Sequence, residues 1–395
     1  MRVVHTSDWH LGRAFHQVGL LGAQARFVDW LVDLVRAERV EAVLVAGDVY
    51  DRALPSPDTV ALLDDALTRL VDAGAQVVLS SGNHDSAVRL GFASELLARA
   101  GVHVRTDLAS IGRPVLLGSE GDELAVYPVP YLEPAVAAPV LDVAATHSAV
   151  LGAALARVQA DAATRHTSIA MAHAFVAGGV GCESERDIAV GGVSVVDARL
   201  FEGVSYAALG HLHGAQQVGE QVAYCGSPVA MSFGEASHTK SVTLLDTGAG
   251  AVRAQSVPTP VERPLAVLRG ELDVLLADRA LSWAESAWCM VVLTDPVRPL
   301  GALETVRRRF PHTLCLDFQP SSTVVPVRRY AGRDLPSRPA LDVCCDFLSH
   351  VRGGAGADEA ERELLQEAVE ATRLRRAAGD DEGRARAVES TEVVA

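Results

Sequence analysis

Apolar and polar positions follow two different periods along the first hundred residues. Short apolar runs, RVVHTS, AVLVA and QVVLS, predict three buried strands. Between them, apolar residues recur at helical spacing over residues 22–38 and again over residues 57–73, where Ser56 before Pro57 is typical of a helix start. Strand–helix units of this length predict an α/β fold with a parallel sheet and helices on its faces.

The same patterning divides the rest of the chain. Five more apolar runs, LAVYPV, SIAMAH, YAALGH, VAYCGS and SVTLLD, extend the first domain over residues 1–258, and SVPTPVERP is typical of a linker. Residues 264–330 alternate strands with helices and predict a small α+β domain. Two short helices are expected within residues 337–375, and the polar residues 376–395 are expected to be disordered.

Composition narrows the class of protein. The 395 residues are 49% hydrophobic and 22% charged, as in a globular protein, and every apolar run is shorter than the ~18 residues that cross a bilayer. Without a signal-peptide pattern, the chain is expected to be cytoplasmic and to have no membrane partner. The net charge of −15 argues against a broad basic surface for nucleic acid. Six scattered cysteines form no C-x-x-C pair, which argues against a structural zinc site and a disulfide framework.

Side chains that can bind a metal ion stand at five predicted strand ends, in the segments SDWH, GDVYD, GNHD, MAH and GHLH. The candidates are Asp8, His10, Asp48, Asp51, Asn83, His84, His173, His211 and His213. Taken singly, an aspartate after a strand is more often a helix cap, and a histidine is more often a satisfied core or surface residue. Together, these carboxylates and imidazoles would converge beyond one edge of the sheet and repel or stay unsatisfied without a cation. Their joint placement therefore predicts a metal site.

The ligand types indicate the number and the kind of ions. About six side chains suffice for two divalent ions if one carboxylate bridges them. Mixed imidazole and oxygen ligands without a thiolate suit manganese or iron better than soft metals, and zinc stays open as an alternative. We therefore expect two divalent metal ions, with Mn²⁺ preferred.

The spacing of these motifs resembles that of a known family. The series D-x-H, G-D-x-x-D, G-N-H-D, a lone H and G-H-x-H is similar to the signature of calcineurin-like metallophosphoesterases. The segments RDIAVGG, YAALGHLH and YCGSPVAMSFGE resemble the nuclease branch of that family, and the resemblance covers about residues 1–375. It implies a metallophosphoesterase sandwich over residues 1–258, a small α+β capping and DNA-binding domain over 264–330, and a C-terminal helical partner-binding segment over 337–375.

The resemblance also implies a role for each candidate residue. One ion would be held by Asp8, His10, Asp48 and His213, and the other by Asp48, Asn83, His173 and His211, with Asp48 as the bridge. His84 would lie just outside the coordination sphere and stabilise charge on the scissile phosphate or on the leaving 3′ oxygen. Archaeal relatives have a histidine at position 51 and protein phosphatases have an aspartate, so Asp51 is expected to orient the catalytic histidine.

The function that the resemblance implies is that of a metal-dependent DNA nuclease. Members of this branch act as double-strand exonucleases and single-strand or hairpin endonucleases in DNA recombination, replication and repair. They work as homodimers within a heterotetramer with an SbcC-type ATPase, and this chain has no GxxxxGK[ST] motif of its own. A phosphatase or cyclic-nucleotide phosphodiesterase with the same core is the alternative, although such enzymes usually lack the part after residue 260. A metal-free scaffold protein would have lost some of the ligands, whereas the chain has them all.

Overall fold

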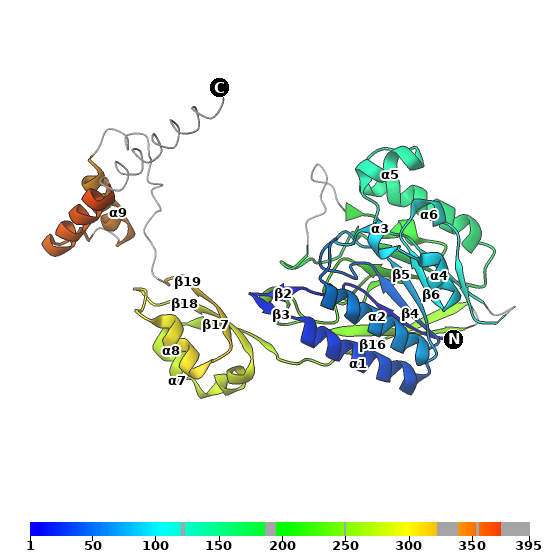
Figure 1. Cartoon of the computed structure of the whole chain (residues 1–395), viewed down its shortest axis with the longest axis horizontal. Helices are drawn as coiled ribbons and strands as arrows, with labels where there is room; N and C mark the ends of the chain where they lie inside the picture. Colours follow the sequence, from blue (N-terminus) through cyan, green and yellow to red (C-terminus); the bar gives the residue numbers. More distant parts are fainter. Residues whose placement is uncertain (120–122, 186–194, 249, 322–338, 353–354, 373–395) are drawn as a thin grey trace, which may run out of the picture. The chain divides into compact units, whose positions relative to one another are not determined.

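Two six-stranded sheets lie face to face in the first of two units of the chain, Met1–Gln319 (Figure 1). The computed structural model describes residues 1–119, 123–185, 195–248, 250–321, 339–352 and 355–372. The second unit is Pro320–Ala395.

The first sheet contains the strands predicted near the N-terminus. Its order is β16 (Ala251–Pro258), β15 (Ser241–Gly248), β1 (Arg2–Thr6), β4 (Ala42–Ala46), β5 (Gln76–Ser80) and β6 (Val102–Arg105). β1, β4, β5 and β6 run parallel, whereas β15 is antiparallel to β1 and to β16. Because β16 pairs with β15 as far as Pro258, the linker predicted at SVPTPVERP is shorter than expected.

The second sheet contains the later strands of the same domain. Its order is β13 (Gln216–Gly219), β14 (Val222–Tyr224), β12 (Tyr206–Gly210), β9 (Thr167–His173), β8 (Leu124–Pro128) and β7 (Val115–Leu117). The four inner strands run parallel, and the two edge strands β7 and β13 are antiparallel to their neighbours.

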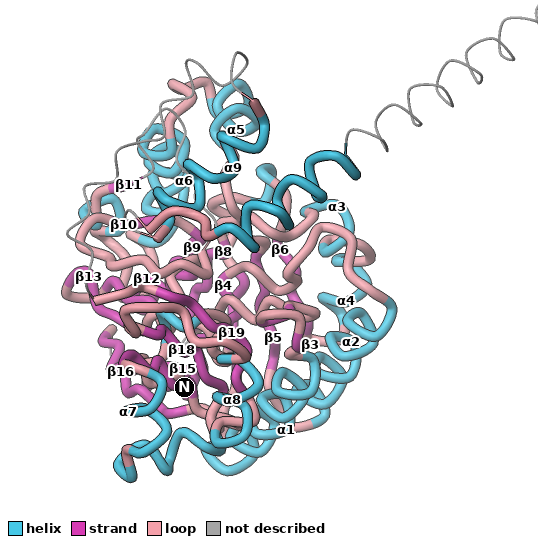
Figure 2. Tube along the Cα trace, turned by 90° about the vertical axis from the view of Figure 1, so that its left-hand side faces the viewer, coloured by secondary structure: helices cyan, strands magenta, loops and turns pink. Residues whose placement is uncertain are grey.

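In the described part of the first unit, helices lie on the outer face of each sheet. α1 (Leu21–Glu38) and α2 (Pro57–Asp72) pack on the first sheet, and α5 (Pro134–Leu141) and α6 (His147–Ala162) pack on the second (Figure 2). The inner faces pack together through buried residues that include Leu44, Met171 and Ala208. The sandwich that the resemblance implies is confirmed, whereas the single parallel sheet with helices on its faces that the periodicity indicates is wrong. A second sheet replaces one helical layer, and a strand buried on both faces has the same continuous apolar pattern in either arrangement.

Short elements connect and flank the sheets. They are β2 (Ala14–Phe15), β3 (Val18–Gly19), α3 (Ala87–Leu90), α4 (Ser94–Arg99), β10 (Phe175–Val176), β11 (Val195–Val196) and the 3-10 helices η1 (Leu108–Ser110), η2 (Ala198–Phe201) and η3 (Phe233–Glu235). β2 and β3 form a hairpin immediately after the loop that follows β1.

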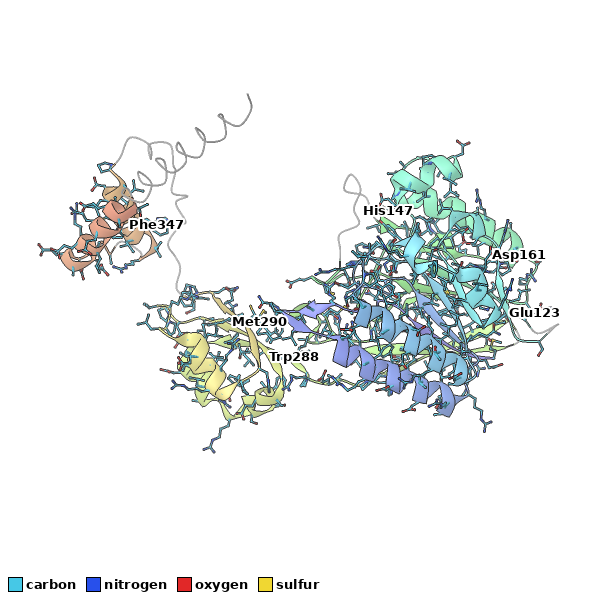
Figure 3. All side chains as sticks on the ribbon, viewed as in Figure 1. Glu123, His147, Asp161, Trp288, Met290 and Phe347 are labelled. Carbon is cyan, nitrogen blue, oxygen red and sulfur yellow. The ribbon has the colours of Figure 1, made fainter. Side chains whose placement is uncertain are left out.

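The small domain begins after the shortened linker. Its strands β17 (Leu265–Gly270), β18 (Trp288–Leu293) and β19 (Thr313–Phe318) form a parallel sheet, and the connections contain α7 (Leu272–Ala277), η4 (Arg279–Ser286) and α8 (Ala302–Arg309). Side chains of this sheet, including Trp288 and Met290 (Figure 3), pack against the β2–β3 hairpin and η3. The Phe15 ring lies 5.8 Å from the Trp288 ring and 4.8 Å from the Phe233 ring, so that one apolar cluster joins the small domain to the first domain.

The second unit contains the two helices that the sequence pattern predicts. α9 spans Ala340–Val351, and a further helix spans residues 359–372. The Arg352 guanidinium joins them by donating two hydrogen bonds of 2.8 Å to the Glu361 carboxylate. The tail predicted to be disordered, 376–395, lies outside the described residues, as do residues 322–338. Among the residues described, no helix has both the length and the apolar character needed to span a membrane.

A buried histidine on β1 joins the two sheets. His5 Nδ1 lies 3.3 Å from the Tyr206 hydroxyl, and its Nε2 lies 3.1 Å from the Leu209 carbonyl oxygen. Burial lowers the pKa of His5 from 6.5 to about 4, against the opposing effect of the Leu209 carbonyl. The unfolded chain therefore binds more protons than the folded chain between these two values. The contribution of His5 to the free energy of unfolding is therefore fully present above pH 6.5, and it is lost as the pH falls from 6.5 to about 4.

We predict that His5→Gln makes the protein less sensitive to acid. A pKa shift of this size corresponds to about 3 kcal/mol. When the pH falls from about 7.5 to 4, the free energy of unfolding should therefore decrease by about 3 kcal/mol less in the variant than in the wild type. Denaturant titrations of both proteins at several pH values measure the difference, and the amide of glutamine preserves a donor for Leu209. Parallel stability curves for the two proteins would refute the assignment.

Candidate metal centre

The carboxyl ends of five strands, β1, β4, β5, β9 and β12, meet at one edge of the paired sheets, and the structure brings the predicted ligands together there. The residues at these ends are Asp8 and His10 after β1, Asp48 after β4, Asn83 and His84 after β5, His173 at the end of β9, and His211 and His213 after β12. All are buried except Asn83, which is partly exposed.

The carboxylate of Asp48 lies in the middle of this cluster. Its Oδ2 is 3.3 Å from Nε2 of His173 and 3.5 Å from Nε2 of His10. Its Oδ1 accepts a hydrogen bond of 2.8 Å from the main-chain N–H of His84. One oxygen therefore faces donor atoms of both predicted ligand sets, which is the position that a bridging carboxylate requires.

Donor atoms on either side of Asp48 have the spacing of metal ligands. His10 Nε2 and His213 Nε2 are 3.2 Å apart, and donor atoms of Asp8, His10 and His213 all lie within 4.8 Å of one another. On the other side, His173 Nε2 is 2.9 Å from the Asn83 side-chain oxygen. Metal–ligand bonds of about 2.0–2.2 Å place neighbouring donor atoms about 3–3.5 Å apart, so these distances fit a divalent cation on each side.

Hydrogen bonds to the outer ring nitrogens fix the histidine tautomers. His173 Nδ1 lies 3.0 Å from the Ala46 carbonyl oxygen, and His84 Nδ1 lies 2.8 Å from the Asp51 carbonyl oxygen. Because a carbonyl oxygen can only accept, Nδ1 carries the proton in both rings. In the neutral His173 ring the lone pair is then on Nε2, the atom that faces Asp48.

Four of the predicted ligands have a left-handed backbone. The φ angles are 53° at Asp8, 42° at His10, 48° at Asp48 and 103° at His211. Such conformations cost about 1–3 kcal/mol each outside glycine, and they persist only where surrounding contacts enforce them. At Asp8 one such contact is visible, because its carboxylate accepts the main-chain N–H of His211 at 3.0 Å. The sharp bends turn the side chains inward from the strand ends.

A glycine gives Asp48 the room it needs. A Cβ atom added to Gly82 would lie 2.1 Å from Asp48 Oδ1 and 2.3 Å from the Asp48 main-chain nitrogen. No side chain can be accommodated at that distance without displacing the loop after β4. The glycine of the GNHD segment is therefore required by the close approach of two loops.

The pKa shifts of the buried groups show that the cluster is stabilised by positive charge. Burial and the neighbouring Asp48 raise the pKa of Asp8 to about 6. Burial opposes the charged form of Asp48 as well, yet His173 and His10 hold the pKa of Asp48 well below its ordinary value. Burial also opposes protonation of His173, but the Asp48 and Asp8 carboxylates outweigh it and raise its pKa to about 9. A divalent cation can supply the charge that this proton otherwise supplies.

Two histidines of the cluster are neutral near neutral pH. Burial lowers the pKa of His211 to about 3, aided by the charge of His173. Burial likewise lowers the pKa of His213 to about 4, against the opposing effect of the Glu235 carboxylate, 3.6 Å from its Nδ1. Neutral imidazoles are the form that binds metal ions, so these rings need no deprotonation step.

The side chain of Asp51 contacts Arg13 and His10, whereas its main chain contacts the His84 ring. The contact to the His84 ring comes from the main-chain oxygen of Asp51. Its carboxylate instead pairs with Arg13 Nη1 at 2.9 Å and lies 3.5 Å from His10 Nδ1. Burial would raise the pKa of this carboxyl group, but the His10 and Arg13 contacts lower it to about 2. The orienting role expected for Asp51 stays a prediction, for which the main-chain oxygen provides one contact to the His84 ring.

Asp85, the last residue of GNHD, is a structural member of the site that sequence reasoning missed. Its carboxylate accepts hydrogen bonds from the main-chain N–H groups of Val49, Tyr50 and Gly82, at 3.1, 2.9 and 2.9 Å. It thereby ties the loop after β5 to the loop after β4, which carries Asp48. Its place directly after His84 was the available signal, but a loop aspartate is ordinary and did not indicate which loop it would hold.

A second missed group surrounds His213. Ser184 Oγ lies 2.8 Å from His213 Nδ1 and 2.6 Å from Oε1 of the buried Glu235, which is also paired with Lys240. Glu185 accepts the main-chain N–H of His213 at 2.6 Å. No local pattern in the sequence connects Ser184 and Glu185 with His213 and Glu235, because the hydrogen bonds between these two segments join positions 28 to 51 residues apart.

Cys182, Glu185 and His213 also place donor atoms within 4.8 Å of one another, but they do not form a metal site of their own. Both Glu185 oxygens accept main-chain N–H groups, from His213 at 2.6 Å and from Cys182 at 2.7 Å. The Nδ1 atom of His213 is held by Ser184. The protein itself therefore satisfies these donor atoms.

A sandwich with a carboxylate and histidine cluster at its strand ends fits a metal-dependent phosphoesterase, and the family and sequence comparisons agree with that class. Residues 1–215 match the calcineurin-like phosphoesterase family. The SbcD subunit of the nuclease SbcCD from Escherichia coli (strain K12) is 32% identical over 321 residues, which cover 74% of this chain and 78% of that protein. The protein of the same name from Staphylococcus saprophyticus is 29% identical over 323 residues, 81% of this chain and 85% of its own. A solved dimetal phosphatase from Danio rerio covers 66% of this chain and 99% of its own, with 14% identity and a TM-score of 0.38.

The chain belongs to the calcineurin-like phosphoesterase family, and within it to the family of SbcD nuclease subunits. As a member it is a phosphodiester hydrolase of the nuclease type. Calcineurin-like phosphoesterases use divalent metal ions, and the donor set described above fits that requirement.

The position of Asp48 leads to a test by metal counting. Asp48→Ala should reduce the metal content from about two ions per chain to less than one, because both ligand sets lose the same oxygen. His213→Ala should leave about one ion, since it removes a donor from one side only. Elemental analysis of the purified proteins after loading with Mn²⁺ gives the count. His5→Gln, which changes a buried histidine outside the cluster, is the matched control, and an unchanged count in Asp48→Ala would rule out the bridging position.

Proposed function

We propose that this chain is a dinuclear, Mn²⁺-preferring DNA nuclease with double-strand exonuclease activity and single-strand or hairpin endonuclease activity. The observation that carries the proposal is the Asp48 carboxylate, whose Oδ2 lies 3.3 Å from a histidine nitrogen on one side and 3.5 Å from one on the other. The similarity to SbcD nuclease subunits supports a phosphodiester of DNA as the substrate. DNA recombination, replication and repair are the processes in which we expect it to act.

The proposed ligand sets divide the cluster at Asp48. Asp8, His10 and His213 would hold one ion with Asp48, and Asn83, His173 and His211 would hold the other with Asp48. Bound there, two divalent ions supply a Lewis acid for the phosphate and lower the pKa of a coordinated water. The imidazole and oxygen donors without a thiolate favour manganese or iron over softer metals.

His84 is proposed to act on the phosphate rather than on the metal. Its main-chain N–H is held by Asp48 at 2.8 Å, and its Nδ1 is held by the Asp51 carbonyl at 2.8 Å, so both ends of the residue are fixed. The ring lies 4.6 Å from the His10 ring, edge to face, next to one proposed ion. When the ring is protonated, Nε2 can donate to a phosphate oxygen or to the leaving 3′ oxygen.

The acidic charge of the chain restricts how it can hold DNA. With a net charge of −15, the chain has no general excess of cations for the phosphate backbone. We propose that the metal centre binds the reacting phosphate, that the small domain adds contacts, and that an ATPase partner of the SbcC type supplies much of the remaining affinity. The small domain also distinguishes this proposal from a phosphatase or cyclic-nucleotide phosphodiesterase, which needs no such addition.

The two helices of the second unit are the proposed docking site for that ATPase. Phe347 (Figure 3), Val351 and Leu364 are 56%, 64% and 65% exposed there, although their side chains are apolar. The Arg352–Glu361 ion pair joins the two helices at 2.8 Å. Short helices with exposed apolar residues gain stability from a partner groove.

We further propose a homodimer within a heterotetramer with the ATPase. In support, the region after GNHD exposes large apolar side chains: Val88, Phe92 and Leu96 are 87%, 79% and 64% exposed. Exposed apolar residues close together in the chain are typical of protein–protein contact surfaces.

The central experiment compares substrates and metals on the purified chain. Labelled hairpin DNA and a generic phosphomonoester are each incubated with Mn²⁺, Mg²⁺ or a chelator. We expect Mn²⁺-dependent cleavage of the DNA. Turnover of the phosphomonoester with intact DNA under every condition would favour the phosphatase alternative.

In the same assay, His84→Ala should slow DNA cleavage by about 10² to 10⁴ while both ions stay bound, because the ring acts on the phosphate. Metal counting accompanies the rate measurement. Loss of one ion equivalent from this variant would instead make His84 a ligand. Asp51→Asn should give a milder defect, since it preserves the main-chain oxygen that holds the His84 ring.

The partner proposal predicts a separation of functions. A chain ending at residue 335, or one carrying Phe347→Glu together with Leu364→Glu, should keep its metals and basal nuclease activity but lose binding to the SbcC-type ATPase and ATP-stimulated cleavage. Co-purification with the ATPase and nuclease rates with and without ATP measure both effects. Glu367→Gln, an exposed polar change on the second helix, is the control. Undiminished complex formation by both altered chains would locate the docking site elsewhere.

A further inference from the structure

Three buried side chains outside the proposed ligand sets converge on His213. Ser184, Glu235 and Lys240 are 6%, 1% and 5% exposed, and they come from two different segments of the chain. We call them the Glu235 network. Glu235 is the last residue of η3, and Lys240 directly precedes β15.

In the Glu235 network, the donor and the acceptor of each hydrogen bond can be assigned. Glu235 pairs with the Lys240 ammonium group, and its Oε1 also accepts the main-chain N–H of Met231 at 3.1 Å, so it is a carboxylate that only accepts. The Ser184 hydroxyl, 2.6 Å from Oε1, must therefore donate its one proton to Glu235. Towards His213 Nδ1, 2.8 Å away, the Ser184 oxygen can then only accept.

This direction determines the state of the His213 ring. Nδ1 of His213 must carry the proton that Ser184 accepts, and the lone pair of the neutral ring is on Nε2. Nε2 is the atom that lies 3.2 Å from His10 Nε2 within the cluster. The main chain of His213 is held as well, because its carbonyl oxygen accepts from Lys240 Nζ at 2.9 Å and its N–H donates to Glu185.

A purely structural purpose accounts poorly for this arrangement. Burying a glutamate and a lysine together removes both charges from water, and proteins with well-packed apolar residues in place of such pairs are often equally stable. A carboxylate that holds the outer nitrogen of a metal-binding histidine, directly or through a hydroxyl, fixes the tautomer and strengthens the ring as a ligand. The Glu235 network has the geometry for the second role.

Resting on the proposed dinuclear centre, we infer that Glu235 is a positioning residue for His213. Through Ser184 it keeps the proton of His213 on Nδ1 and holds Nε2 available for one of the two ions. The ion held by Asn83, His173 and His211 does not depend on it. Removal of the Glu235 network therefore weakens one metal site and leaves the other unchanged.

The test titrates the metal-free full-length chain with Mn²⁺ and follows free Mn²⁺ by electron paramagnetic resonance. Glu235→Gln combined with Lys240→Met removes both buried charges at once, so that neither is left unpaired. Loss of such a supporting group typically costs 10- to 100-fold in metal affinity, and we expect that loss at one site only. In a His213→Ala background, the same double change should cause no further loss.

Two further variants keep the test decisive if the double variant fails to fold. Ser184→Ala removes only the hydroxyl and should weaken the same site, whereas Ser184→Thr preserves the hydroxyl and should restore it. Asp161→Asn, on α6, alters a partly buried ion pair with Arg165 and should leave both Mn²⁺ affinities unchanged (Figure 3 labels Asp161).

The outcomes separate this inference from the proposed function. A wild-type chain that binds fewer than two Mn²⁺ ions overturns the dinuclear centre and the inference with it. Two ions in the wild type, with both affinities unchanged in Ser184→Ala and in the double variant, overturn only the inference. Selective weakening of the site that His213→Ala also removes supports it.

Discussion

The arrangement of the site depends on one oxygen atom, Oδ2 of Asp48, which faces histidines from both sheets. His10 follows β1 of the first sheet, and His173 ends β9 of the second, so the two sheets must meet closely at this edge. They do so almost backbone to backbone: a Cβ atom on Gly210 would lie 1.9 Å from the Ala46 carbonyl oxygen. A larger residue at position 210 would separate β4 from β12 and move the histidines after β12 away from Asp48. The close packing of the sheets is therefore a condition for the metal centre.

This arrangement is costly for the protein without its ions. Left-handed backbone at Asp8 and Asp48 and several buried ionisable groups all oppose folding. Main-chain hydrogen bonds offset part of the cost, most clearly at Asp85, whose carboxylate accepts three N–H groups. Burial and the nearby Asp48 raise the pKa of Asp85 to about 6, so a fraction of this supporting group is protonated already slightly below neutral pH. Divalent cations that bind only the folded chain would stabilise it by mass action.

The sequence predicted those parts of the site that a local pattern can carry. Each candidate ligand follows or ends a strand that its own apolar run predicts, and parallel strands bring their carboxyl ends to one edge, so the cluster could be inferred before the structure was known. The second sheet as a partner layer was not predicted from periodicity, because a strand covered by helices and a strand covered by another sheet have the same pattern. The orientation of the Asp51 side chain was also beyond the pattern, since it depends on Arg13, 38 residues earlier. Glu235 ends the segment YCGSPVAMSFGE that carries the resemblance, but the sequence assigned it no role, because its contact to Ser184 is made only in the folded chain.

The two elements that contact the small domain are both connected to ligands on one side of the metal centre. The β2–β3 hairpin, which begins four residues after His10, packs through Phe15 against Trp288 of the small domain. The other contact element, η3, packs through Phe233 in the same apolar cluster and ends at Glu235, which holds His213 through Ser184. His10 and His213 are the two histidines whose Nε2 atoms lie 3.2 Å apart. A shift of the small domain would therefore act on His10 and His213, the two histidines proposed to hold one ion, from both directions.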